Sequence, residues 1–290
     1  MERHSLISLL RYKRPEGSVT QEYFCQKYLE PVFGEPDEFG NYVLIIPDSD
    51  GLYPKVCFAA HHDTVHKTDG IQNIFTKGNH VYSEGDECLG ADCTTGVWLI
   101  LEMIAEKIPG VYVIHAAEEI GCIGSSRLVA SQPDWLHDLG AVISFDRYGT
   151  NNIITHQMGY RTASETFSKS LAGILGMSFK SDPDGSYTDS NEYAEIVSEC
   201  TNISVGYYGQ HTKNEHQDIL FAYKLRDALL AADWSQLVFA RDPSVQERKS
   251  WGNYWSNYYS EEFDRPGDPY TNLHAETCYE VEDVVRDWPE

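Results

Sequence analysis

Several short segments of this chain are apolar at nearly every position and rich in β-branched and aromatic residues. A strand with one solvated face would alternate apolar and polar residues, so these runs predict strands that are covered on both faces. The runs are residues 43–46, 56–60, 111–116, 141–145, 153–155 and 203–207. Because doubly covered strands need layers above and below them, this pattern constrains the fold more than any other feature.

Three longer stretches between these runs read as helices: residues 94–107, 163–175 and 217–239. Thr212 and Asn214 are both suitable N-caps for the last one. Strands that alternate with helices predict an α/β fold. We therefore expect a three-layer sandwich in which a mostly parallel, mixed central sheet has helices on both faces.

The composition narrows the possible partners. The 290-residue chain carries 22 Lys and Arg against 45 Asp and Glu, a formal net charge of -23. Nucleic acid and anionic membrane surfaces would be repelled, so we expect neither as a partner. The seven cysteines are scattered and odd in number, which favours free thiols in a reducing compartment. With no signal-peptide pattern and no run of about 20 apolar residues, the sequence predicts a cytoplasmic protein.

The character of the sequence changes near residue 242. We expect a single domain over residues 1–241 and an extension over residues 242–290. Residues 251–259 of that extension are aromatic yet polar, and an acidic tail follows. Two interpretations remain open: the aromatic side chains pack on the domain, or the extension covers an active site or a subunit contact.

Histidines and acidic residues stand where several apolar runs end. They are His61, Asp63, Asp92, Glu118, Glu119, Asp146 and His211. Because the carboxyl ends of parallel strands meet at one edge of a sheet, we expect one crevice to collect these side chains. Zinc prefers imidazole and carboxylate ligands, and two such ions about 3.5–4 Å apart can act on one carbonyl group. The ordered set therefore predicts a two-metal hydrolytic centre.

Each acidic residue also has an ordinary structural explanation. Asp92 precedes a predicted helix and is suited to be its N-cap. Glu118 and Glu119 fit a solvated loop after a buried strand. Asp146 and the adjacent Arg147 fit a local ion pair. For the metal centre to be absent, all of these explanations must hold together.

The histidines differ in their expected roles. His211 also fits a surface turn, and His216 competes with it as a ligand. We favour His211 because we expect His216 to lie inside the following helix. His115 lies within an apolar strand and is expected to be a core residue with satisfied hydrogen bonds.

The order of the motifs resembles the co-catalytic metallopeptidases, a superfamily that includes zinc aminopeptidases, peptidase T and related amidohydrolases. The resemblance rests on His61-His62-Asp63-Thr64-Val65, Leu89-Gly90-Ala91-Asp92, Glu118-Glu119-Ile120-Gly121, Asp146 and His211-Thr212. It implies two divalent metal ions, zinc in the first place, with manganese or cobalt as alternatives.

The resemblance also implies a set of metal ligands. His61 and Asp146 would hold one ion. Glu119 and His211 would hold the other, and Asp92 would bridge the two.

Two further residues receive roles from the same resemblance. Glu118 would be the general base that takes a proton from the metal-held water and returns it to the leaving amine. Asp63 would accept a hydrogen bond from His61 and fix the orientation of that ring.

The chain departs from many relatives after the bridging residue. Where they carry a second Asp and a Lys or Asn, this sequence has Cys93 and Thr94. A cis peptide bond between Asp92 and Cys93 is implied by the resemblance. The interval from Asp146 to His211 is too short for the lid or dimerisation domain of the larger relatives, so the compact, single-domain members are the better comparison.

The expected function is hydrolysis of an amide bond, most simply by an aminopeptidase or small-peptide peptidase. The first alternative is an amidohydrolase that removes an acyl group from a small N-acylated molecule. A catalytically inactive metal-binding module and a one-zinc acyl-transfer cyclase are alternatives of other classes. Tyr187, Tyr207 and Tyr208 are candidate hydroxyl donors, and residues 182–190 form either a substrate-side loop or a plain turn. The oligomeric state does not follow from the sequence.

Overall fold

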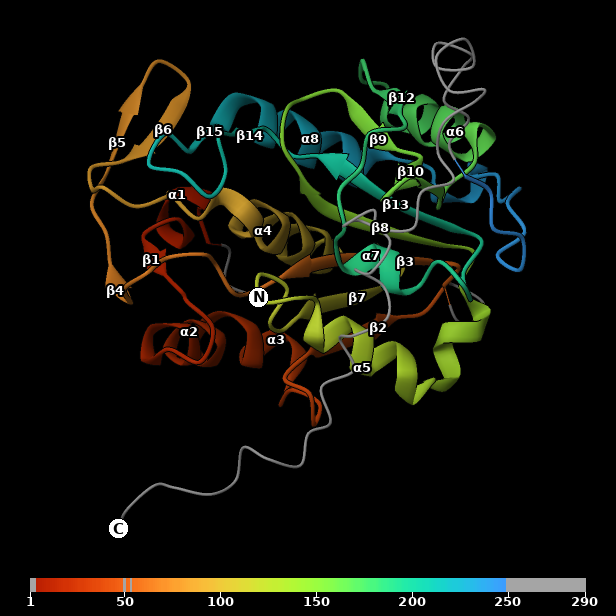
Figure 1. The fold of residues 1–290 in the computed structure, drawn as a ribbon, viewed down its shortest axis with the longest axis horizontal. Helices are drawn as coiled ribbons and strands as arrows, with labels where there is room; N and C mark the ends of the chain where they lie inside the picture. The colour runs from red at the N-terminus through yellow and green to blue at the C-terminus, as the bar shows by residue number, and fades with distance from the viewer. Residues whose placement is uncertain (1–3, 49–50, 53, 249–290) are drawn as a thin grey trace, which may run out of the picture. The chain divides into compact units, whose positions relative to one another are not determined.

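The structure is built around a seven-stranded mixed sheet. In this computed structural model, which describes residues 4–48, 51–52 and 54–248, the strand order is β12-β9-β13-β8-β3-β7-β2 (Figure 1). The strands are β2 (Tyr42–Ile46), β3 (Val56–His61), β7 (Gly110–His115), β8 (Ala141–Arg147), β9 (Asn152–Ile154), β12 (Lys180–Asp182) and β13 (Glu199–Ser204). Strand β3 is parallel to both of its neighbours, β7 and β8. The pairs β13–β8 and β12–β9 are also parallel, whereas the pairs β9–β13 and β2–β7 are antiparallel. The sheet is mixed and mostly parallel, as the sequence predicts.

Both faces of the sheet are covered, because successive strand residues point to opposite sides. Phe58 and Ala60 of β3 join an apolar cluster with Trp98, whereas Cys57 and Ala59 join a second cluster with Leu128. The first cluster includes residues of α4 (Ala91–Ala105), α6 (Glu165–Leu175) and α8 (Ile219–Ala231), and the second includes residues of α5 (Ile123–Ser131) and the 3-10 helix η2 (Asp134–Asp138). The result is the expected three-layer α/β sandwich.

The three predicted helices are present, with shifted ends. α6 begins at Glu165 because the Ser164 hydroxyl oxygen accepts a hydrogen bond from the backbone N–H of Phe167 at 3.0 Å. The expected limits of the last helix are wrong, since α8 covers Ile219–Ala231 and the short 3-10 helix η3 (Trp234–Gln236) follows. Its N-cap is Asp218 rather than Thr212 or Asn214, because the residues just before it form a strand.

That strand belongs to a four-stranded antiparallel sheet that the sequence does not predict. The sheet has the order β14-β15-β6-β5. It consists of β5 (Ile74–Lys77), β6 (His80–Ser83), β14 (Tyr207–Tyr208) and β15 (His216–Asp218). Two-stranded pairs are formed by β1 (Tyr12–Lys13) with β4 (Gly70–Ile71) and by β10 (His156–Gln157) with β11 (Tyr160–Arg161). Strands of two to four residues carry too little alternation to be recognised from sequence.

The amino-terminal residues form short helical segments that pack on the core. They are α1 (Leu6–Leu9), α2 (Val19–Phe24), the π-helix η1 (Cys25–Leu29) and α3 (Glu30–Phe33). Leu6, Leu9 and Phe24 are fully buried in the same cluster as Trp98. The remaining helix, α7 (Asp189–Glu192), lies between β12 and β13 in the chain.

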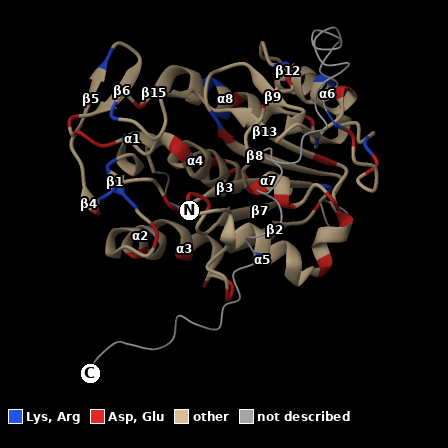
Figure 2. Ribbon diagram, viewed as in Figure 1, with Lys and Arg blue, Asp and Glu red and all other residues tan. Residues whose placement is uncertain are grey.

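Acidic residues are spread over several elements of the fold, including α2, α3 and α6 (Figure 2). None of the helices in the described part of the chain has the length and apolar content needed to span a bilayer. Residues 242–248, the described part of the predicted extension, contact the domain: the backbone N–H of Arg161 donates to the carbonyl of Glu247 at 2.7 Å. The rest of the predicted extension, including the aromatic residues 251–259, lies outside the described residues.

Candidate metal centre

Four of the predicted residues meet at one edge of the central sheet. His61 is the last residue of β3, and Asp146 is the penultimate residue of β8. Glu118 and Glu119 follow β7 in a short loop. Because β3 is the parallel neighbour of both β7 and β8, the carboxyl ends of these strands lie side by side.

Asp92 approaches this edge from the start of α4. The N-cap of α4 is Gly90, and the two oxygens of Asp92 lie next to His61 and His211, so the interpretation of Asp92 as an N-cap is wrong. The peptide bond between Asp92 and Cys93 is cis, as the resemblance implies. Gly90 has a φ of 71°, and a Cβ there would lie 2.7 Å from the ring of His66. Only glycine therefore fits the turn that delivers Asp92.

The His61 ring is fully buried and faces three carboxylates. Its Nε2 lies 3.2 Å from Oδ1 of Asp92, 3.6 Å from Oδ1 of Asp146 and 3.9 Å from Oε2 of Glu118. These four side chains come from separate parts of the chain. The structure thus brings His61 and its proposed partners together.

Asp92 also reaches a second histidine with its other oxygen. Oδ2 of Asp92 lies 3.2 Å from Nε2 of His211, and Oε2 of Glu119 lies 3.1 Å from the same nitrogen. His211 comes from the loop between β14 and β15, and half of its side-chain surface is exposed. The two oxygens of Asp92 therefore face two different imidazoles, which is the arrangement of a bridging carboxylate.

Asp63 lies behind His61 and organises the loop that follows β7. Its Oδ1 is 3.3 Å from Nδ1 of His61. Its two oxygens also accept hydrogen bonds from the backbone N–H groups of Glu118 at 3.1 Å and Glu119 at 3.0 Å. One buried carboxylate thus sets both the His61 ring and the direction of the Glu118–Glu119 loop.

Two hydroxyl groups hold Asp146. The Thr188 hydroxyl donates to Oδ2 of Asp146 at 2.6 Å, and the Tyr207 hydroxyl donates to Oδ1 at 3.2 Å. Thr188 was not singled out in the sequence, where nothing distinguishes it from other threonines. Arg147 instead lies 3.4 Å from Asp182, so the alternative of an Asp146–Arg147 ion pair is wrong.

The ionisable groups of this cluster strongly influence one another. Burial raises the pKa of Glu118 to about 10, and burial together with the charge of Asp92 raises the pKa of Asp146 to about 7. Hydrogen bonds to Asp92 and Glu119 raise the pKa of His211 to about 11. These pKa shifts indicate that the carboxylates of the cluster carry more negative charge than its two imidazoles can neutralise.

The donor set fits divalent metal ions. Among the described residues, the ion-pair partners of Asp92, Glu118, Glu119 and Asp146 are His61 and His211 alone. Oε1 of Glu119 is buried and has no hydrogen-bond partner there. Four carboxylates that share only two histidines among the described residues are expected to bind cations, and the imidazole and carboxylate donors suit zinc-like ions.

His216, His115 and Cys93 each make contacts with other side chains or backbone groups of the protein. The expectation that His216 lies inside the last helix is wrong, because it lies in β15, where its ring stacks on Tyr82 and Tyr208. His115 is buried, with its two nitrogens 3.3 Å from Asn41 and 3.2 Å from Tyr193, as expected for a core residue. Burial raises the pKa of Cys93 well above its usual value, and its thiol donates to the carbonyl of Phe145.

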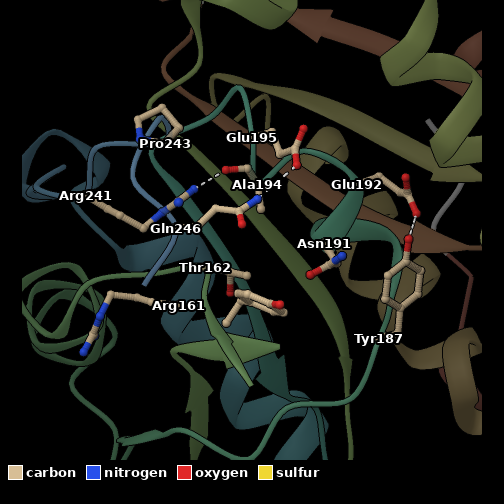
Figure 3. A pocket seen from close by; sticks show the side chains of 11 residues that line it. Arg161, Thr162, Tyr187, Asn191, Glu192, Ala194, Glu195, Arg241, Pro243 and Gln246 are labelled. Atoms are coloured by element: carbon tan, nitrogen blue, oxygen red, sulfur yellow. Dashed lines mark hydrogen bonds between the residues drawn. The ribbon is translucent and has the colours of Figure 1, made fainter. Parts of the chain in front are cut away.

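A pocket of about 490 Å³ lies beside α7. Figure 3 shows Tyr187 and Glu192 on one side of it and Arg161 and Arg241 on the other. The Tyr187 hydroxyl donates to Glu192, so it is engaged in a protein contact rather than free to act as a donor. Tyr187 directly precedes Thr188, whose hydroxyl donates to Asp146. The same segment of the chain therefore lines this pocket and contacts the candidate metal centre.

Solved structures share this fold at low sequence identity. The aminopeptidase PepT from Bacillus cereus has a TM-score of 0.62 and 15% identity, over 78% of this chain and 95% of that one. A tripeptidase from Staphylococcus aureus has a TM-score of 0.62 and 16% identity, over 78% and 95% of the two chains. The TET1 peptidase from Pyrococcus horikoshii has a TM-score of 0.61 and 13% identity, over 78% and 98%. These likenesses support the α/β sandwich.

The sequence itself gives a family match. Among curated proteins, none matches this chain. The sequence model of peptidase family M28 matches residues 41–288. This range contains all seven residues of the proposed centre and covers most of the chain. The chain therefore belongs to peptidase family M28.

Proposed function

We propose that this metal-dependent peptidase uses two divalent ions to remove residues from the amino terminus of short peptides. Membership of family M28 makes the chain a metal-dependent peptidase. The observation that carries the two-ion proposal is the position of Asp92, whose oxygens each lie 3.2 Å from a different histidine, His61 and His211. A single carboxylate between two imidazoles is what a shared ligand requires.

The proposed ligand set follows this division. His61 and Asp146 would hold one ion, Glu119 and His211 would hold the other, and Asp92 would be shared by both. When bound, the two ions polarise the scissile carbonyl group and lower the pKa of a water molecule. Zinc suits these donors best, with manganese or cobalt as alternatives.

Glu118 is the proposed general base. Its Oε2 lies 3.9 Å from Nε2 of His61, the nitrogen that also faces Asp92 and Asp146, so its carboxyl group lies where a proton would be transferred. Asp63 orients His61 and holds the backbone of Glu118. An inactive metal-binding module would not need this carboxylate, so its presence supports turnover.

The pocket beside α7 is the proposed substrate-binding region. One of its lining residues, Tyr187, directly precedes Thr188, and most of its lining side chains are polar, which suits a short peptide rather than a large apolar molecule. Solved proteins with this fold include an aminopeptidase and a tripeptidase. These likenesses support a preference for small peptides with a free amino group.

A cytoplasmic location and a single catalytic domain complete the proposal. The six cysteines within the described residues are free and buried, which supports a reducing compartment. We retain residues 1–241 as the catalytic domain and residues 242–290 as the extension.

The test is an assay of the purified protein on short peptides, aminoacyl anilides and N-acylated amino acids. Chelation should abolish turnover and zinc should restore it. Glu118→Gln should lower kcat by about 10²–10⁴-fold while metal binding persists. The matched control is Glu165→Gln on the exposed surface of α6, which should keep wild-type activity.

Two outcomes would contradict the proposal. Unchanged kcat in Glu118→Gln would remove the proton-transfer role. Turnover of N-acylated amino acids, with none of free peptides, would favour the amidohydrolase alternative.

A further inference from the structure

Glu215 is a buried carboxylate close to the metal centre that the proposed chemistry does not use. It exposes 1% of its surface and directly precedes β15. Its Oε2 accepts a hydrogen bond from the backbone N–H of Gly90 at 2.8 Å, and its Oε1 accepts one from the backbone N–H of Asp92 at 3.0 Å. Both oxygens therefore hold the turn that presents Asp92.

The same residue is fixed to the loop of His211. The backbone N–H of Glu215 donates to the carbonyl of Thr212 at 3.0 Å, which closes a tight turn directly after His211. A second hydrogen bond joins α4 to β15: the Thr95 hydroxyl donates to Oε1 of Gln217 at 2.5 Å. The segment that carries His211 is thus fastened at two points to the start of α4.

We propose that Glu215 is a positioning residue that holds Asp92 and His211 at the spacing needed to share a metal ion. The inference rests on the proposed two-metal function. His211 lies in the loop between β14 and β15 and its side chain is half exposed, so its distance from Asp92 depends on that loop. Glu215 ties that loop to the backbone of Asp92 itself. Loss of this tie should weaken the ion between Asp92, Glu119 and His211 more than the ion near His61, because the latter would keep His61 and Asp146 as ligands.

The first variant is Glu215→Gln. A glutamine amide has one acceptor oxygen, so its NH₂ group would face one of the two backbone N–H groups. The changed turn should move Asp92 relative to His211. Changes to residues that orient metal ligands weaken metal affinity by roughly 10–100-fold. Titration of the metal-free protein with Zn²⁺ should therefore give two ions with wild-type protein, and a weaker site whose Kd rises at least about tenfold in the variant.

Glu199→Gln is the matched control. Glu199 is also a fully buried carboxylate that accepts backbone N–H groups, those of Ser164 at 2.6 Å and Ala240 at 2.7 Å. It lies at the start of β13, at the opposite end of that strand from the metal centre. This variant should lose thermal stability while both zinc affinities stay within about threefold of wild type.

Glu215→Asp provides a second test if Glu215→Gln does not fold. It keeps the charge and both acceptor oxygens but is one methylene shorter, so the same zinc site should weaken to a smaller extent. Selective weakening of one site in either variant supports the inference. Wild-type affinities in a folded Glu215 variant, equal weakening of both sites, or the same change in Glu199→Gln would overturn it. Fewer than two ions in the wild-type protein would instead overturn the two-metal function, and the inference with it.

Discussion

The two histidines that face Asp92 are supported in different ways. His61 is fully buried at the end of a central strand, with Asp63 behind it. His211 has half of its side chain exposed and lies in a loop, with a φ of 62° in the left-handed region. Its distance from Asp92 depends on hydrogen bonds through Glu215 rather than on the apolar core. One half of the centre is therefore built by the sheet, and the other half by polar contacts between loops.

The largest expected difference comes from removing each histidine in turn. His61→Ala should destabilise the metal-free protein by about 3–5 kcal/mol, because it leaves buried carboxylates without their partner. His211→Ala should change stability by less than about 1 kcal/mol, since its ring is half exposed. Both variants should lose at least about 10³-fold in kcat/KM. Urea unfolding of the chelated proteins checks the stability difference, and equal destabilisation would erase the distinction between the halves.

The pH dependence of the metal-free protein tests the His61 half. The pKa of Asp146 is raised to about 7 and that of Glu118 to about 10, so the folded state keeps protons that the unfolded chain has already released. Stability from these groups is complete below their unfolded pKa values, near 4, and is lost as the pH rises through 7 and toward 10. The chelated protein should therefore have a lower Tm at pH 9 than at pH 6.

Two controls accompany this measurement. Zinc should remove most of the decrease, because bound metal replaces the protons. The decrease should become smaller but persist in His211→Ala, because the raised pKa of His211, about 11, contributes to it while Glu118 and Asp146 face His61. A chelated protein that is as stable at pH 9 as at pH 6 would contradict the account.

A smaller effect is expected at Thr188. Thr188→Val removes the hydroxyl that donates to Asp146 at 2.6 Å and keeps a similar shape. We expect a stability loss of about 1 kcal/mol and a decrease in metal affinity on the order of tenfold. Thr188→Ser keeps the hydroxyl and should behave like wild type. Calorimetric zinc titration of both variants checks this, and identical behaviour would show that the hydroxyl does not orient Asp146.

The same comparison explains what could be predicted from the sequence. His61, Asp63 and Asp146 end or follow long apolar runs, so their signals are local, and β3 and β8 begin and end within two residues of the predicted limits. The order of the motifs then gave the remaining candidates through a family resemblance. The sheet that is covered on both faces is predicted in the same way, from short runs that are apolar at nearly every position.

The contacts that support the His211 half have no such signal. Asp92 and Glu215 are 123 residues apart in the sequence, and β15, which follows Glu215, has three residues. The wrong start of the last helix has the same origin, because residues 216–218 pair with β6 across the fold. Long-range pairing overrides the local helical pattern there, and no short window of sequence reveals it.

The most direct test of the two-metal claim is anomalous diffraction from zinc-loaded crystals, recorded at the zinc absorption edge. The account predicts two peaks about 3.5–4 Å apart, with the Asp92 carboxylate between them. One peak should lie against His61 and Asp146, and the other against Glu119 and His211. A single peak, or two peaks that Asp92 does not bridge, would contradict the account.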